Sequence, residues 1–319
     1  MDLAQIQGSL RVLQLPMRTK FRGITTREVA LFEGPAGWGE FSPFLEYDDF
    51  ECANWLRSGI EAATTKEFPK FRDSIKINGT IPATDSIQEI ESLITLYPGA
   101  EVFKVKVGND LKSDLARLEQ VKKIAPKAKL RVDVNGSWSV DDAIFNIRAI
   151  YEEIGELEYV EQPVAELDDL KRLKDNLRVD VKIAGDEVIR KARDPFAISL
   201  NGAIDVLMLK VAPLGGVKRA IAIAEHHNLP VVVSSALESA IGISHGLRLA
   251  AAIPELKYAS GLATGSLFTS DIATHEIKDG AISLTSPNPN LEALERFAAP
   301  KERLEWWRDR IKRCWEVLG

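Results

Sequence analysis

Two lysines stand two residues apart in the stretch EVFKVKVGND (101–110), which has the valine-rich pattern of a buried β-strand. Because side chains alternate between the two faces of a strand, Lys104 and Lys106 project from the same face. Burying like charges side by side is costly unless nearby anions compensate for them. An ammonium group near another positive charge has a lowered pKa, which suits a general base. The pair therefore marks a candidate proton-transfer site, with a solvated strand end as the alternative for Lys104.

Three carboxylates occupy the ends of the next three strand candidates. Asp133 lies in LRVDVNG, Glu161 in LEYVEQP and Asp186 in VKIAGDE, with spacings of 28 and 25 residues, about one strand-and-helix unit each. Converging carboxylates repel one another unless positive charge lies among them. Oxygen ligands without histidine or cysteine suit Mg²⁺ or Mn²⁺ rather than zinc. The pattern predicts a divalent metal site, most simply for Mg²⁺, and the alternative is a salt-bridge cluster with the neighbouring lysines.

The elements that position these residues alternate between short apolar runs and amphipathic, charged segments. Such alternation predicts parallel strands covered by helices, and eight units in about 200 residues fit a (β/α)8 barrel. In that barrel Lys210, in DVLMLKVAP, lies one strand beyond the carboxylates and across the ring from the lysine pair. The expected strands are 75–81, 102–108, 130–136, 157–163, 181–187, 205–213, 229–239 and 259–267.

The two flanks of the chain differ from this rhythm. Residues 1–73 carry alternating patterns, such as LRVLQLPM, and then a helical stretch, which predicts a small α+β capping domain. Residues 74–284 form the barrel domain. We expect the tail, 285–319, to pack back on the cap through Trp306, Trp307 and Trp315. The predicted fold class is thus α/β: a modified (β/α)8 TIM barrel with an α+β cap built from both termini.

Composition narrows the class of partner. The chain has 319 residues and a net charge of −6, which does not favour nucleic acid or an anionic membrane surface. Its apolar runs are shorter than the ~18 residues of a membrane span, and its first residues lack a secretory signal pattern. Cys52 and Cys314 lie too far apart in sequence to indicate a disulfide framework or a zinc pattern. We expect a cytoplasmic enzyme that acts on a small carboxylate; the oligomeric state stays open.

The stretches KVKV, DVNG, VEQP, AGDE and LKVAPLGG together resemble the enolase superfamily, in its muconate-lactonizing-enzyme subgroup. The resemblance covers essentially the whole chain. It implies that Asp133, Glu161 and Asp186 bind the metal and that Lys106 is the acid/base. Lys104 would then keep Lys106 deprotonated, and Lys210 would stabilise an enediolate from the opposite face. This pairing of a lysine base with Mg²⁺ is a general feature of the superfamily.

Within that subgroup, GWGEFSPFLEYDD, DVNGSWS and SSALESAIGISHG resemble the enzymes of menaquinone biosynthesis that dehydrate 2-succinyl-6-hydroxy-2,4-cyclohexadiene-1-carboxylate. The resemblance therefore implies a lyase. An N-succinylamino-acid racemase or a dipeptide epimerase is the nearest alternative, because both would use Lys106 and Lys210 as opposed bases. A non-catalytic barrel that binds a small acid is a distant alternative. It predicts loss of at least one of the six charged residues, and all six are present in the sequence.

Further polar residues are candidate substrate contacts. Some share a strand face with Asp133 or follow the apolar run VVV in the expected seventh strand. Others lie in a glycine-containing segment that is either a lid or an ordinary connection. Arg131 also has a second interpretation, neutralisation of a carboxylate. The predicted contacts are Arg131, Asn135, Ser234, Ser235, Lys20, Arg22 and Gly23.

Overall fold

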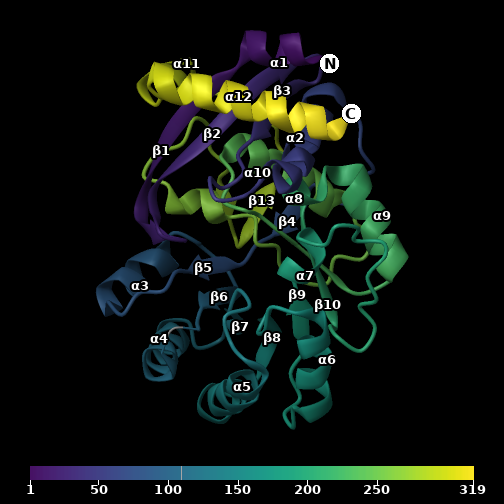
Figure 1. The fold of residues 1–319 in the computed structure, drawn as a ribbon. Coiled ribbons are helices and arrows are strands. Elements are labelled where there is room, and N and C mark those ends of the chain that lie inside the picture. The colour runs from purple at the N-terminus through teal and green to yellow at the C-terminus, as the bar shows by residue number, and fades with distance from the viewer. Residues whose placement is uncertain (109) are drawn as a thin grey trace.

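A barrel of parallel strands lies beneath a smaller cap in the computed structural model, which describes residues 1–108 and 110–319 (Figure 1). Seven strands form one sheet in the order β11-β10-β9-β8-β7-β6-β5, with only parallel pairing. Their valine, isoleucine and leucine side chains are almost all buried, as expected for a sheet that is covered on both faces. The strands are β5 (Gly79–Ile81), β6 (Val102–Lys106), β7 (Lys129–Asp133), β8 (Leu157–Glu161), β9 (Ile183–Gly185), β10 (Val206–Lys210) and β11 (Val231–Ser234).

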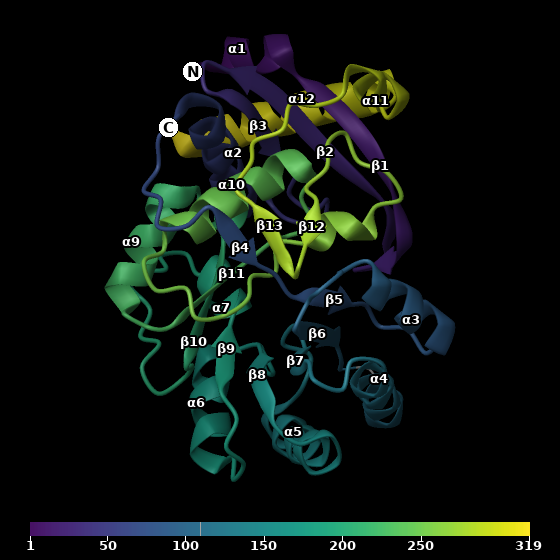
Figure 2. The same cartoon turned by 180° about the vertical axis from the view of Figure 1, so that it is seen from behind.

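Helices follow these strands along the chain and surround the sheet (Figures 1 and 2). Side-chain caps begin several of them; Ser139, for example, accepts a hydrogen bond from the Asp142 amide at the start of α5. This alternation confirms the predicted α/β fold class. The helices are α3 (Ile87–Thr95), α4 (Leu111–Ile124), α5 (Val140–Ile154), α6 (Leu167–Asn176), α7 (Glu187–Arg190), α8 (Val211–Leu214), α9 (Val217–His227) and α10 (Ala240–Ala252).

The prediction of a continuous eighth strand at 259–267 is wrong. Only isolated bridges occur there: Gly261 pairs with Ser234 of β11, and Ser260 pairs with Ile77. A Cβ atom on Gly261 would lie 2.4 Å from Ser234 Oγ, so this close contact requires glycine. The chain then turns into the 3-10 helix η1 (Thr264–Leu267). The two bridges nevertheless connect β11 to the segment before β5 and so close the ring.

The first expected strand, 75–81, is divided between two sheets. Its first part is β4 (Ser74–Lys76), which pairs antiparallel with β13 (Ala281–Ser283); β13 in turn pairs with β12 (Ile277–Lys278). Between β4 and β5 the main chain changes partners, because the Ile77 amide donates to Gly280 and the Asn78 amide donates to Ser260.

The cap consists of the antiparallel strands β1 (Arg11–Phe21), β2 (Ile24–Gly34) and β3 (Gly37–Phe41), with helices from both ends of the chain. Trp307 is fully buried there, edge-on to Phe41, and its indole N–H donates to Glu28. Figure 2 shows the C-terminal helix beside the cap strands. The domain boundaries at residues 73 and 284 stay a prediction. The helices of the cap are α1 (Leu3–Ser9), α2 (Asp49–Thr64), α11 (Leu291–Arg296) and α12 (Lys301–Leu318).

None of the helices in the described part of the chain combines the length and the apolar character that crossing a membrane requires.

Candidate active site

The strand register brings the charged residues to one end of the barrel. Lys106 pairs with Asp133, and Asp133 pairs with Glu161, so three neighbouring strands present these side chains in one row. Asp186 directly follows β9 as the residue before α7, and Lys210 is the last residue of β10. All five residues therefore lie at the carboxyl ends of parallel strands, where barrel enzymes carry their chemistry.

Ion pairs connect the lysines to the carboxylates. Lys104 Nζ lies 2.8 Å from Glu161 Oε2 and 3.1 Å from Asp133 Oδ2. Lys106 Nζ lies 2.6 Å from the same Asp133 oxygen, and Lys210 Nζ lies 2.6 Å from Asp186 Oδ2. Because the carboxylates are almost completely buried, each of these charges depends on its partners for compensation.

The pKa values of the two neighbouring lysines move in opposite directions. Burial alone would lower the pKa of Lys104, but the carboxylates of Glu161 and Asp133 outweigh it and hold this pKa well above its usual value. Burial lowers the pKa of Lys106; Asp133 offsets part of this effect, and the Lys104 charge adds to it. Lys106 is thus the lysine whose environment favours the neutral, basic form.

The carboxylates also differ. Burial would raise the pKa of Asp133 and of Asp186, but nearby lysines outweigh it and hold both pKa values below their usual range. For Glu161, burial and the charge of Asp133 raise the pKa to about 7, since Lys104 is shared between the two carboxylates. The lysines therefore compensate only part of the negative charge of the buried carboxylates.

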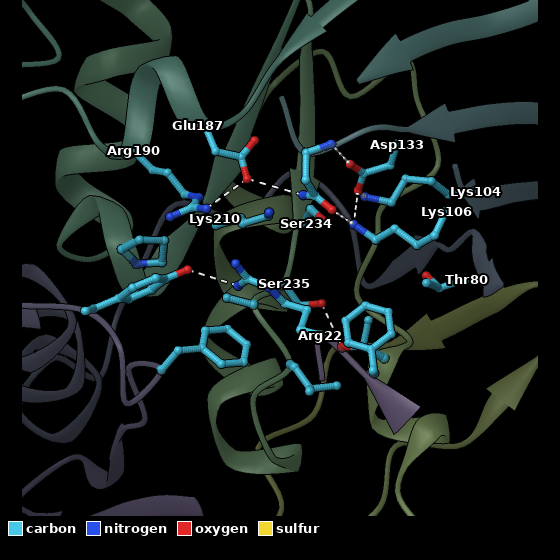
Figure 3. A pocket seen from close by; sticks show the side chains of 18 of the residues that line it. Arg22, Thr80, Lys104, Lys106, Asp133, Glu187, Arg190, Lys210, Ser234 and Ser235 are labelled. Carbon is cyan, nitrogen blue, oxygen red and sulfur yellow. Dashed lines mark hydrogen bonds and ion pairs between the residues drawn. The ribbon is translucent and has the colours of Figure 1, made fainter. Parts of the chain in front are cut away.

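A pocket opens over this cluster between the barrel and the cap. Lys106 and Lys210 lie on different sides of it, with Arg22 from the cap at its rim (Figure 3). The apolar part of the lining comes mainly from the cap, with the aromatic side chains Phe21, Phe44, Tyr47 and Trp55. A small acid with one apolar and one charged end fits such a lining.

Among the residues that the structure describes, three buried carboxylate oxygens at the site lack a hydrogen-bond partner: Glu161 Oε1, Asp186 Oδ1 and, in the pocket lining, Glu187 Oε2. Such atoms are costly to bury and fit a cation that would complete their coordination. Among residues 1–108 and 110–319, however, no three His, Cys, Asp or Glu side chains form a group compact enough to hold a metal ion in this arrangement. Lysine ammonium groups contact the carboxylates instead, as the salt-bridge alternative expects.

The predicted substrate contacts divide into two groups. Asn135, Ser234, Ser235 and Arg22 line the pocket. Asn135 accepts a hydrogen bond from Lys106 Nζ at 2.6 Å, and Ser235 Oγ donates to Gly261 O at 2.6 Å.

Lys20 and Gly23 are exposed and do not line the pocket, although they flank Arg22. Arg22 and Gly23 both have positive φ and form the tight turn between β1 and β2, which matches an ordinary hairpin connection.

Arg131 shares a strand face with Asp133 but lies outside the pocket, two residues nearer the start of β7. It is fully buried, pairs with Glu158 at 2.6 Å and donates to Asn78 Oδ1 at 2.9 Å. Its guanidinium also lies over the ring of Tyr159. The placement agrees with neutralisation of a carboxylate, the second interpretation of this residue.

Sequence reasoning missed several polar residues of the site, and three of them bear directly on its charges or its geometry. Glu187 and Arg190 line the pocket from α7 and form an ion pair of 2.9 Å. Gln162 is buried beside Glu161, and its side-chain oxygen accepts from the Asp186 amide at 2.9 Å, which orients the end of β9. The EVIR stretch after Asp186 carried a signal for the first two, because its acid and base are three residues apart.

Two family models match the chain: the enolase C-terminal domain-like model over residues 90–289 and the enolase N-terminal domain-like model over residues 12–63. The muconate lactonizing enzyme from Pseudomonas putida has the same fold, with a TM-score of 0.73 and 21% identity over 91% of this chain and 98% of that one. The L-Ala-D/L-Glu epimerase from Bacillus subtilis also shares it, with a TM-score of 0.73 and 21% identity over 88% of this chain and 96% of that one. The fold and the site define a member of the enolase superfamily.

Relatives in sequence narrow the family. A protein of Mycolicibacterium smegmatis named o-succinylbenzoate synthase is 47% identical over 99% of this chain and 98% of its own length. Relatives with the same name from Mycobacterium ulcerans and Mycobacterium tuberculosis are 48% and 47% identical, each over 99% of this chain and 96% of their own length. The chain belongs to the o-succinylbenzoate synthase family.

Proposed function

We propose that the chain dehydrates 2-succinyl-6-hydroxy-2,4-cyclohexadiene-1-carboxylate to 2-succinylbenzoate, as a carbon–oxygen lyase of menaquinone biosynthesis in the cytoplasm. The observation that carries this proposal is the pair of lysines on different sides of one pocket, Lys106 and Lys210, above three buried carboxylates. The names of the relatives support the same reaction. The partner is a small carboxylate, and neither nucleic acid nor a membrane is involved.

Lys106 is the acid/base of the proposed reaction. Its pKa is lowered, which brings it closer to the neutral amine that a base requires; in that form it removes the proton from the carbon next to the substrate carboxylate. The resulting negative charge spreads over the carboxylate as an enediolate, which the Lys210 ammonium stabilises. The protonated Lys106 then transfers its proton to the departing hydroxide, so that water leaves and the ring becomes aromatic. Lys104 holds Asp133 and Glu161 in place and keeps positive charge near Lys106.

Asp133, Glu161 and Asp186 would hold a divalent cation, most simply Mg²⁺ and alternatively Mn²⁺. The unpartnered oxygens of two of these residues, Glu161 Oε1 and Asp186 Oδ1, support this assignment, since hard carboxylate oxygens are the ligands these ions take. When bound, such a cation supplies positive charge against the charge that develops on the substrate carboxylate.

Racemisation of N-succinylamino acids or epimerisation of dipeptides is the second candidate. Lys106 and Lys210 face the pocket from different sides, as an enzyme that works on both faces of one carbon requires. Exchange of the α-proton in D₂O tests this activity directly, because one base serves one face and two opposed bases serve both.

An absorbance assay tests the proposed function. The purified protein is supplied with the cyclohexadiene carboxylate, with and without Mg²⁺, beside a panel of N-succinylamino acids and dipeptides. We expect rapid, Mg²⁺-dependent conversion of the cyclohexadiene. Absence of its turnover, or turnover of the panel alone, would overturn the proposal.

A further inference from the structure

Arg27, on β2 of the cap, is buried at the boundary with the barrel, with 2% of its surface exposed. Its Nε donates to Leu237 O at 3.1 Å, and its Nη2 reaches Ala236 O at 3.5 Å. The same Nη2 donates to Ser42 O, which follows β3 in the cap. One guanidinium thus holds main-chain carbonyls of the cap and of the loop after β11 together.

The loop after β11, residues 235–238, is a wall of the pocket. Ser235, Ala236 and Leu237 all line it, whereas Arg27 does not. Leu237 has a φ of 65°, in the left-handed region that residues other than glycine rarely adopt. Because this conformation is unfavourable for leucine, the loop depends on contacts from outside to keep its shape.

Glu238 supplies a further contact from within the loop. Its Oε2 accepts from the Ala236 amide at 2.6 Å, so the peptide units on both sides of Ala236 have partners. Glu40 lies nearby and accepts from Ser239 Oγ at 2.5 Å and from the Gly242 amide at 3.0 Å, at the start of α10.

Both glutamates are buried, which raises the pKa of each, and the positive charge of Arg27 offsets part of this effect. Burial lowers the pKa of Arg27 to about 10, which leaves the guanidinium charged at neutral pH. The guanidinium N–H groups that hold the loop are therefore present at neutral pH.

Arg27 also contacts an aromatic residue of the pocket lining. Its guanidinium lies 4.1 Å from the ring centre of Phe44, and that of Arg22 lies 4.2 Å from the same ring. Phe44 and Arg22 line the pocket. A change at Arg27 would thus displace two walls at once without removing any group that touches a substrate.

We propose that Arg27, flanked by Glu40 and Glu238, is a positioning residue that fixes the 235–237 wall and Phe44 in the shape that binds the substrate. This inference rests on the proposed function for the identity of that substrate. Arg27, a buried residue of the cap, thus sets substrate affinity, whereas the lysines carry out the proton transfer.

Arg27→Lys tests the proposal, because lysine keeps the charge but cannot span Leu237 O and Ser42 O as the guanidinium does. The matched control is Arg72→Lys, since Arg72 also donates to main-chain carbonyls, those of Ala250 and Ile253 at 2.6 Å, away from the pocket. We measure KM and kcat for the cyclohexadiene carboxylate and the dissociation constant of 2-succinylbenzoate, with thermal unfolding of each variant.

For Arg27→Lys we expect KM and the product dissociation constant to rise about tenfold, with kcat within about threefold of wild type and little change in Arg72→Lys. Folded Arg27→Lys with wild-type KM and product affinity would overturn the inference. An inactive wild-type protein would instead overturn the proposed function.

If Arg27→Lys does not fold, Glu238→Ala serves as the test instead. This substitution removes the carboxylate that accepts the hydrogen bond from the Ala236 amide. We expect a rise in KM of about fivefold for this variant. An unchanged KM in folded Glu238→Ala would likewise overturn the inference.

Discussion

Replacing Lys104 by methionine tests how the buried carboxylates are compensated. Lys104 Nζ is the partner of Glu161 at 2.8 Å and contacts Asp133 at 3.1 Å, and only 7% of its side chain is exposed. Methionine fills a similar volume without charge. The substitution therefore leaves a buried carboxylate, that of Glu161, without its ion-pair partner.

Removing one partner of a buried ion pair costs about 3–5 kcal/mol. For a chain of 319 residues the unfolding entropy is about 0.7 kcal/mol per kelvin, so this loss corresponds to a fall in Tm of roughly 4–7 °C without metal. The remaining negative charge should bind a divalent cation at least about tenfold more tightly. At saturation that difference adds about 1.4 kcal/mol of stabilisation, or about 2 °C, beyond the effect of Mg²⁺ on the wild type.

Thermal unfolding with EDTA and with saturating Mg²⁺ measures both effects. Lys174→Met is the control, because Lys174, on α6, forms an ion pair with Asp205, which directly precedes β10, at the opposite end of that strand from Lys210. Both side chains are a quarter or more exposed, so we expect a loss of about 1 kcal/mol or less. If Mg²⁺ stabilises Lys104→Met no more than the wild type, the carboxylates are not the cation site.

Three further variants test other parts of the account. Lys210→Ala should lose nearly all turnover, and its Tm should also fall because buried Asp186 loses an ion-pair partner; turnover above about 10% of wild type would exclude a role in stabilising the enediolate. Trp307→Ala should cost about 3–5 kcal/mol in chemical unfolding, since this side chain is fully buried in the cap, and a loss below 1 kcal/mol would contradict that packing. Burial and the charge of Glu40 raise the pKa of Glu238 to about 7, so its contribution to stability is full below about pH 4.5 and falls by roughly 3 kcal/mol as pH rises to about 7. Glu238→Gln lacks this loss, so in metal-free buffer its Tm relative to wild type should increase from pH 5 to pH 8, whereas a constant difference would contradict the burial of that charge.

The charged site was readable from the sequence because charges interrupt apolar strands at regular intervals. Period-two alternation gave the shared face of Lys104 and Lys106, and the spacing of Asp133, Glu161 and Asp186 matched one unit each. Alternation fixes the face of a residue but not its depth along the barrel. For this reason Arg131 was expected at the pocket and lies below it.

Other features depend on contacts between distant segments, which a single sequence does not reveal. The segment expected as the eighth strand forms only bridges, with Ile77 and with Ser234, and both partners come from other parts of the chain. The left-handed backbone of Leu237 has no local signal, since its support comes from Arg27, 210 residues earlier. The opposite pKa shifts of Lys104 and Lys106 likewise follow from which carboxylate each one contacts.

The most direct test of the account is the turnover of Lys106→Ala. The purified variant is assayed by absorbance with the cyclohexadiene carboxylate and Mg²⁺, and Mg²⁺ binding is followed by thermal shift in the same preparation. We predict loss of dehydration by at least about 10³-fold with the Mg²⁺-dependent shift retained, because the alanine variant lacks the base but keeps all three carboxylates. Dehydration near the wild-type rate in this variant would contradict the assignment of Lys106 as the group that removes the proton.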